Sequence, residues 1–131
     1  MWLLEKVIKG DILCFYSDVT IKELSRAPQH VKKLLEYIPH RHRLKLRQSG
    51  NVIALAQAYI KQKVVGNSSF EDCLHISYAT IYKASALVSW NFKHIVKDAR
   101  IKGYNSVNLS HNYSPLLILT PKRLMVNEKE N

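Results

Sequence analysis

Residues 68–96 are the most informative stretch of the sequence, because a helix signal is followed at once by a strand signal. Ser68 precedes Glu71 by three residues, which is the spacing of a capping box at a helix start. The apolar run 86–90 follows as a predicted strand, and Asn91 stands at its C-terminal end, where ligands collect in open α/β sheets. Helical spacing predicts a core-facing row made of Phe70, Cys73, Leu74, Ser77, Tyr78 and Ile81.

The rest of the chain alternates between helical and strand patterns, which predicts an α/β fold with a mostly parallel sheet. Gly10 is expected to end the first helix and Ser49 to cap the fourth. At this length the chain is expected to be a single domain over 1–126, with 127–131 as a disordered tail. Besides the segments above, the patterns predict helices over 2–9, 20–27, 29–38 and 51–63, a helical turn over 92–99, strands over 12–17, within 39–48 and over 116–121, and a polar irregular segment over 100–115.

The net charge of +10 at pH 7 favours a polyanionic partner, either nucleic acid or an acidic protein segment, although charge also serves solubility alone. No apolar run approaches the ~20 residues that span a membrane, and charge interrupts the N-terminus too early for a signal peptide. Cys14 and Cys73 lie in apolar patterns without CxxC spacing, so we expect free thiols in a reducing cytoplasm and no zinc site.

The densest basic stretch is 39–48, where Leu44 and Leu46 alternate with basic residues as in a short edge strand. Two interpretations of the charges are open. Edge strands carry Lys and Arg to block aggregation, and basic side chains also contact phosphates. The candidates for phosphate contacts are Arg41, Arg43, Lys45 and Arg47.

Several separated motifs resemble one known family. Asp72 and His75 stand three residues apart on the predicted helix, the run WNFKHIV begins at Trp90, and Glu23 closes the pattern S-x-x-x-x-x-E-L. In this order they resemble a PIN domain, the nuclease fold of the VapC-like toxins. The resemblance covers nearly the whole chain and implies a three-layer α/β fold.

What the resemblance implies is a metal-dependent endoribonuclease, the toxin of a toxin–antitoxin pair, with RNA as substrate and an antitoxin protein as partner. Glu23 and Asp72 would be carboxylates of a Mg²⁺ or Mn²⁺ site, and Asn91 would lie at its edge. Taken singly, an Asp in a first helical turn only stabilises the helix dipole by about 0.3–1 kcal/mol, and Asn91 is a turn residue. Glu23 alone is an ordinary solvated residue. The WNFKHIV run adds two further candidates for RNA contacts, Lys93 and His94.

One part of the family pattern is absent, because PIN domains begin with a strand that carries the first metal-binding Asp. Asp18 is the nearest candidate to replace that residue, and Glu71 is another acid nearby. Without this N-terminal strand, the strands 12–17 and 86–90 pair directly, accept a strand from a partner or from a second copy in a homodimer, or leave a marginal fold. Two alternatives to an active nuclease stay open: a catalytically impaired remnant that binds RNA or an antitoxin segment without cleavage, and a truncated reading of a longer gene.

Overall fold

The computed structural model describes residues 2–64, 70–89 and 95–130. The chain forms two compact units, Met1–Arg47 and Gln48–Asn131, whereas the sequence predicted a single domain. Both units are mixed α/β and contain short parallel strands. Among the described residues, no helix is long and apolar enough to cross a membrane.

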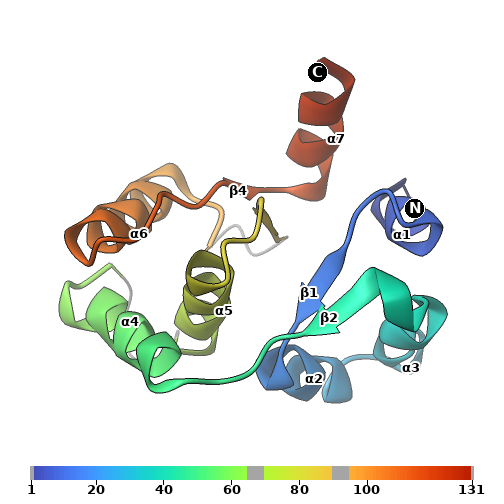
Figure 1. The fold of residues 1–131 in the computed structure, drawn as a ribbon, viewed down its shortest axis with the longest axis horizontal. Coiled ribbons are helices and arrows are strands. Elements are labelled where there is room, and N and C mark those ends of the chain that lie inside the picture. Colours follow the sequence, from blue (N-terminus) through green and yellow to red (C-terminus); the bar gives the residue numbers. More distant parts are fainter. Residues whose placement is uncertain (1, 65–69, 90–94, 131) are drawn as a thin grey trace. The chain divides into compact units, whose positions relative to one another are not determined.

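The first unit consists of two parallel strands with helices between them (Figure 1). The apolar strand pairs in register with the basic segment, so the strand predicted within 39–48 is confirmed. Its elements are α1 (Trp2–Lys9), β1 (Cys14–Tyr16), α2 (Asp18–Ser25), α3 (Gln29–Lys32), the 3-10 helices η1 (Leu34–Tyr37) and η2 (His40–His42), and β2 (Arg43–Lys45).

Gly10 ends α1, as the sequence predicted. Its φ of +88° lies in the left-handed region, and its N–H donates to the carbonyl of Val7 at 3.1 Å. The position also needs a residue without a side chain, because an added Cβ would lie 2.8 Å from Nε2 of His42. Nδ1 of His42 lies 2.9 Å from the carbonyl oxygen of Ile8, and this contact attaches the end of α1 to the segment that enters β2.

The helix predicted over 29–38 is divided in two, α3 and η1. Lys33, at the junction, has φ −86° and ψ 0°. Ile38 is extended, with φ −94° and ψ 122°, because a residue that precedes proline disfavours the helical region. Pro39 therefore ends this segment and leads the chain toward β2.

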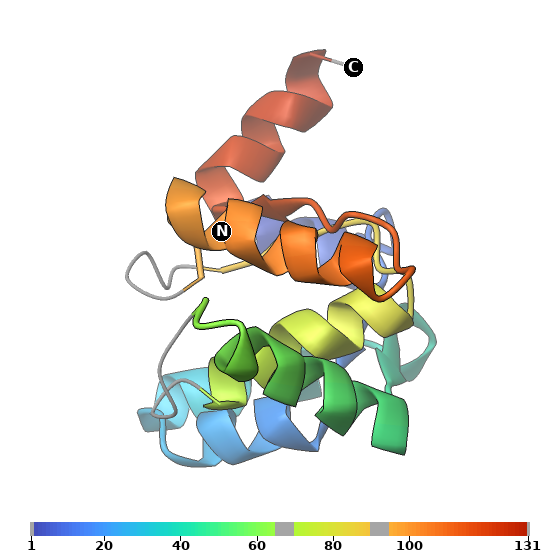
Figure 2. The same cartoon turned by 90° about the vertical axis from the view of Figure 1, so that its left-hand side faces the viewer.

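The second unit is organised around α4, α5 and α6, which Figures 1 and 2 show packed side by side. A pair of short parallel strands accompanies them, with Leu87 opposite Ile118 and Val88 opposite Leu119. The elements are α4 (Gly50–Lys61), α5 (Phe70–Ile81), β3 (Leu87–Val88), α6 (Asp98–Ser110), β4 (Ile118–Leu119) and α7 (Pro121–Glu130).

Small buried residues bring α4 and α5 together. Ala56 and Ser77 are fully buried, and Oγ of Ser77 donates to the carbonyl of Val52 at 2.6 Å. Ser49 caps α4 as predicted, since its Oγ accepts from the N–H of Val52 at 3.3 Å. The predicted core-facing row of α5 is buried at Cys73, Leu74, Ser77 and Tyr78. The capping role predicted for Ser68 lies outside the described residues.

The prediction of an irregular segment over 100–115 is wrong, because Asp98–Ser110 forms α6. Tyr104, Val107 and Asn108 are buried at helical spacing on one face of this helix. An apolar periodicity cannot reveal a face whose central residue is an asparagine. The polar residue is tolerated there because its hydrogen bonds are satisfied by neighbouring helices.

Asn108 is the centre of a buried hydrogen-bond cluster. The hydroxyl of Tyr59 on α4 donates to Oδ1 of Asn108, and Nδ2 donates to Oγ1 of Thr80 on α5 at 3.2 Å. Nδ2 also lies 3.2 Å from Oδ1 of Asn105, which accepts from the N–H of Leu116 at 2.6 Å. The cluster therefore links three helices to the segment that enters β4.

The last helix, α7, continues to Glu130 and so overlaps the tail predicted over 127–131. Thr120 provides the start signal, since its Oγ1 accepts from the N–H of Arg123 at 3.1 Å. Pro121 occupies the first helical position, where a missing N–H has no cost.

Replacing Tyr59 with Phe should lower the free energy of unfolding by about 1–3 kcal/mol, because a buried acceptor on Asn108 loses its donor. Urea denaturation followed by far-UV circular dichroism measures the change. Tyr37→Phe is the control, since Tyr37 is 61% exposed and should unfold like the parent chain. A loss for Tyr59→Phe no larger than that of the control would contradict the role given to the cluster.

Candidate functional site

The predicted metal-site residues are distributed over both units. Asp18 and Glu23 lie on α2 in the first unit, whereas Asp72 lies on α5 in the second. In the first unit, α2 carries two of the predicted carboxylates, whereas Asp72 is the one predicted carboxylate in the second unit. Three predicted site residues lie outside the described residues: Asn91, Lys93 and His94.

Asp18 is engaged in an ion pair with a predicted RNA-binding residue. Its Oδ1 lies 2.7 Å from Nζ of Lys45. The two residues meet because Asp18 follows β1 and Lys45 ends β2, and the C-terminal ends of two parallel strands lie side by side. The two side chains are 69% and 49% exposed, so the pair stabilises the fold by at most about 1 kcal/mol. A cation at Asp18 would have to displace the lysine ammonium.

Glu23 does not join Asp18 on one face of α2. The two residues are five positions apart, which places them roughly 140° apart around an α-helix. Glu23 is exposed. The helix therefore does not assemble a pair of carboxylates by itself.

Asp72 lies half-buried in the first turn of α5, beside a buried thiol and a buried phenol. Burial, with a smaller effect of the Asp72 carboxylate, raises the pKa of Cys73 to about 12, and Arg100 acts in the opposite direction. Burial also raises the pKa of Tyr104, and the same two charges act on it with the same signs. The charges of Asp72 and Arg100 therefore both act on Cys73 and Tyr104.

Arg100 was missed by the sequence reasoning because it fell in the segment predicted to be irregular. On α6 it precedes Tyr104 by one helical turn, and its guanidinium donates to the carbonyl of Val64 near the end of α4. Arg100 and Tyr104 are four residues apart, so a helix predicted over this segment would have placed them side by side on one face.

Metal binding is not supported within either unit. Among the described residues, no group of three or more His, Cys, Asp or Glu side chains is arranged to hold a metal ion. Asp18 is ion-paired with a lysine, and Asn91, a predicted oxygen donor of the second unit, lies outside the described residues. The Mg²⁺ or Mn²⁺ site therefore stays a prediction.

The four basic residues predicted to contact phosphates differ in their surroundings. Arg43 is half-buried, with its guanidinium carbon 5.9 Å from the ring centroid of Tyr16 and a guanidinium nitrogen 3.3 Å from Nδ1 of His40. Lys45 is in the ion pair described above. The side chains of Arg41 and Arg47 are exposed, as is that of Lys45.

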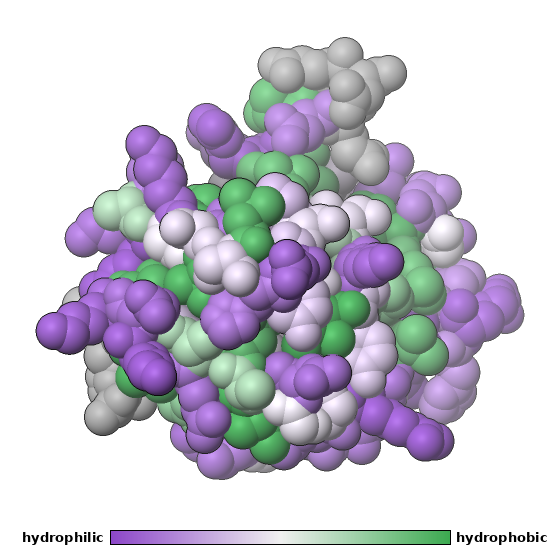
Figure 3. All heavy atoms as spheres, turned by 60° about the vertical axis from the view of Figure 1, so that its left-hand side comes forward, coloured by the Kyte–Doolittle hydropathy of each residue, from purple (hydrophilic) through white to green (hydrophobic). Residues whose placement is uncertain are grey.

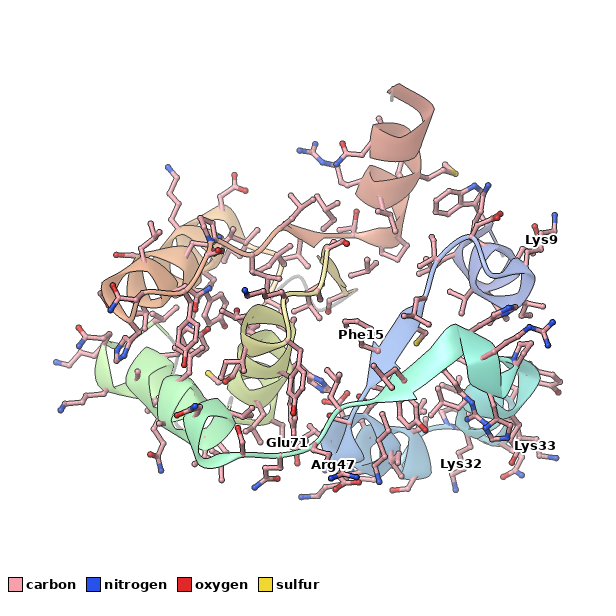
Figure 4. All side chains as sticks on the ribbon, viewed as in Figure 1. Lys9, Phe15, Lys32, Lys33, Arg47 and Glu71 are labelled. Atoms are coloured by element: carbon pink, nitrogen blue, oxygen red, sulfur yellow. The ribbon has the colours of Figure 1, made fainter. Side chains whose placement is uncertain are left out.

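Further basic side chains on the first unit were not singled out by the sequence pattern. Lys9 at the end of α1, Lys32 on α3 and Lys33 directly after it are exposed and project outward (Figure 4). They are separated in sequence, so no local motif unites them. With Arg41 and Arg47 they form what we call the basic surface of the first unit.

Comparison with protein-family models, curated proteins and solved structures gives no match to the chain. The resemblance to PIN domains therefore stays a prediction from the motifs.

The unfolding free energy should decline as the pH rises from about 9 toward 12. The raised pKa of Cys73 means that the folded chain keeps this proton while the unfolded chain, with a pKa near 9.0, releases it. The stability that comes from the protonated Cys73 thiol is fully present below pH 9, and it is lost as the pH rises toward the pKa of about 12 in the folded chain. Urea titrations at closely spaced pH values measure it, and Cys73→Ala should flatten the first part of the decline. Equal slopes in both proteins would contradict this assignment.

Proposed function

We propose that this chain binds RNA through the basic surface of its first unit. The observation that carries the proposal is the exposure of Arg41 and Arg47 on either side of β2, in a chain with a net charge of +10. Phosphate contacts by exposed Lys and Arg supply most of the affinity of nonspecific nucleic-acid binding. Lys9, Lys32 and Lys33 add exposed positive charge to the same unit.

Charge is a better guide than apolarity to a binding surface of this protein. Hydrophilic and hydrophobic side chains are interspersed on the face drawn in Figure 3. The basic surface, in contrast, consists of residues of one sign from α1, from the end of α3, from η2 and from the segment after β2. Such a surface attracts a polyanion over a distance of about 8–10 Å at physiological salt.

The ion pair between Asp18 and Lys45 regulates how much of this surface is available. The carboxylate holds one ammonium that would otherwise contact a phosphate. Arg43 is partly withdrawn by its packing on Tyr16. Removal of the Asp18 charge should therefore strengthen RNA binding.

A second candidate is the metal-dependent endoribonuclease of a toxin–antitoxin pair, with an antitoxin protein as partner and a PIN-like three-layer fold. It is favoured by the order of Glu23, Asp72 and Asn91 along the chain, and by the position of Asp72 in a first helical turn. Parallel strands joined through helices in each unit are compatible with that fold. Because Asp18, the candidate to replace the missing first Asp, is ion-paired with Lys45, RNA binding without cleavage is the function that we favour.

The double variant Arg41→Gln/Arg47→Gln should weaken binding of a single-stranded RNA about tenfold. It should also reduce the salt dependence of the affinity, because fewer counterions are released on binding when fewer phosphates are contacted. Fluorescence anisotropy at several salt concentrations measures both quantities. Lys61→Gln/Lys83→Gln removes the same charge from exposed positions of the second unit. Asp18→Asn should tighten binding. Equal losses in the two double variants would contradict a site on the first unit.

Cleavage of the same RNA distinguishes the two candidates. The binding function predicts intact RNA with Mg²⁺ or Mn²⁺ present, although the RNA is bound. Cleavage that is lost in EDTA and in Asp72→Asn, but kept in Glu71→Gln, would establish the nuclease instead. Glu71 is the matched control because it lies in the same first turn of α5 and carries the same charge.

A further inference from the structure

The strand β1 has one edge that no described strand covers. The carbonyl of Tyr16 accepts from the N–H of Leu46 at 2.7 Å, so Tyr16 directs its backbone groups toward β2. Successive residues of a strand direct their N–H and C=O groups to opposite edges. The backbone of Phe15 therefore faces away from β2. Within the part of the chain that the structure describes, β1 belongs to a sheet of two strands.

The backbone carbonyl of Phe15 makes only a weak hydrogen bond among the described residues of the first unit. Its carbonyl has a contact of 3.8 Å with Sγ of Cys14, and a thiol is a poor donor. Phe15 is half-buried, so water reaches it only in part. Half-buried donors and acceptors are stabilised when another backbone pairs with them.

The two strands of this sheet differ in how their outer edges are protected. β2 carries Arg43 and Lys45 and is followed by Arg47, and charged side chains of this kind discourage further pairing. The segment 12–17, which contains β1, has no charged residue. Its composition is that of an interior strand, yet it lies at an edge of the sheet.

The apolar surface beside this edge is also incompletely covered. Leu44 lies opposite Phe15 in the register, so both side chains are on the same face of the sheet. Leu44 is 51% exposed, and Leu13, just before β1, is 53% exposed. Figure 4 shows Phe15 projecting from β1. A pair of three-residue strands is marginal in isolation, and a third strand would stabilise it.

We propose that the edge of β1 at Phe15 binds an extended peptide of a partner protein by strand addition, and that acidic residues flank the apolar centre of this peptide. The N–H and C=O of Phe15 supply the donor and the acceptor, and apolar side chains of the peptide extend the face formed by Phe15 and Leu44. The acidic flanks follow from charge complementarity, since β2 and its neighbours are basic.

A second copy of this chain suits the edge less well. Each copy has a net charge of +10, so pairing of two β1 edges brings like charges together beside the sheet. An acidic peptide removes that repulsion. The strand pairing at Phe15 does not depend on RNA binding, whereas the acidic flanks of the peptide would meet the same basic side chains that are proposed to contact RNA.

The test uses the full chain and a synthetic peptide, acetyl-Asp-Asp-Val-Ile-Val-Ile-Asp-amide. Amide exchange by NMR should slow at Phe15 when the peptide is added. A control peptide with N-methyl groups on its four central residues cannot pair along either edge, and it should bind at least roughly tenfold more weakly. A third peptide with lysines in place of the aspartates should also bind more weakly, and the difference should shrink at high salt.

Four results would overturn the proposal. Equal binding of the N-methylated peptide would mean apolar contact without strand pairing, and equal binding of the lysine peptide would remove the acidic partner. Protection at Val88 on β3, with none at Phe15, would assign the peptide to the other sheet. Protection of Phe15 in the chain alone, rising with its concentration, would show that a second copy occupies the edge. Because the changes are made in the peptide, every comparison uses the same folded chain.

Discussion

The arrangement of helices in the second unit depends on the hydrogen bonds of one buried side-chain amide, that of Asn108. Asn108 is fully buried, and its partners come from three helices: Tyr59 on α4, Thr80 on α5 and Asn105 on α6 itself. Asn105 in turn accepts from the N–H of Leu116, just before β4. An unsatisfied amide in such a position costs about 1–3 kcal/mol, a large part of the stability of a small domain. The helices α4, α5 and α6 are therefore held in the arrangement that supplies these partners, and the edge-to-face contact of Tyr59 with Tyr104, with centroids 5.2 Å apart, completes it.

This packing decides the chemistry around Asp72. Because α6 lies beside α4, Arg100 reaches the end of α4 and its charge acts on the same buried groups as that of Asp72. The acid that most resembles a catalytic residue in sequence thus lies in surroundings that also suit a structural role.

The first unit places its charges differently. Its short parallel strands bring Asp18 and Lys45 together at their C-terminal ends. The packing of Arg43 on Tyr16 takes a second cation partly out of solvent. What remains exposed is a set of basic side chains from separate segments, together with a strand edge that carries no charge. These two features suit two different partners, a polyanion for the charges and an extended peptide for the edge.

The sequence by itself determined what depends on neighbouring residues. Helical spacing and the Ser49 cap predicted α4, the row from Cys73 to Tyr78 predicted the buried face of α5, and alternation along 39–48 predicted a strand. Only the tertiary structure decided that Asp98–Ser110 is helical, because its buried face contains Asn108, whose partners are distant in sequence. The same holds for the Asp18–Lys45 pair and for the place of Arg100 near Asp72, since a pattern along one chain contains no information about which side chains meet when separate segments pack.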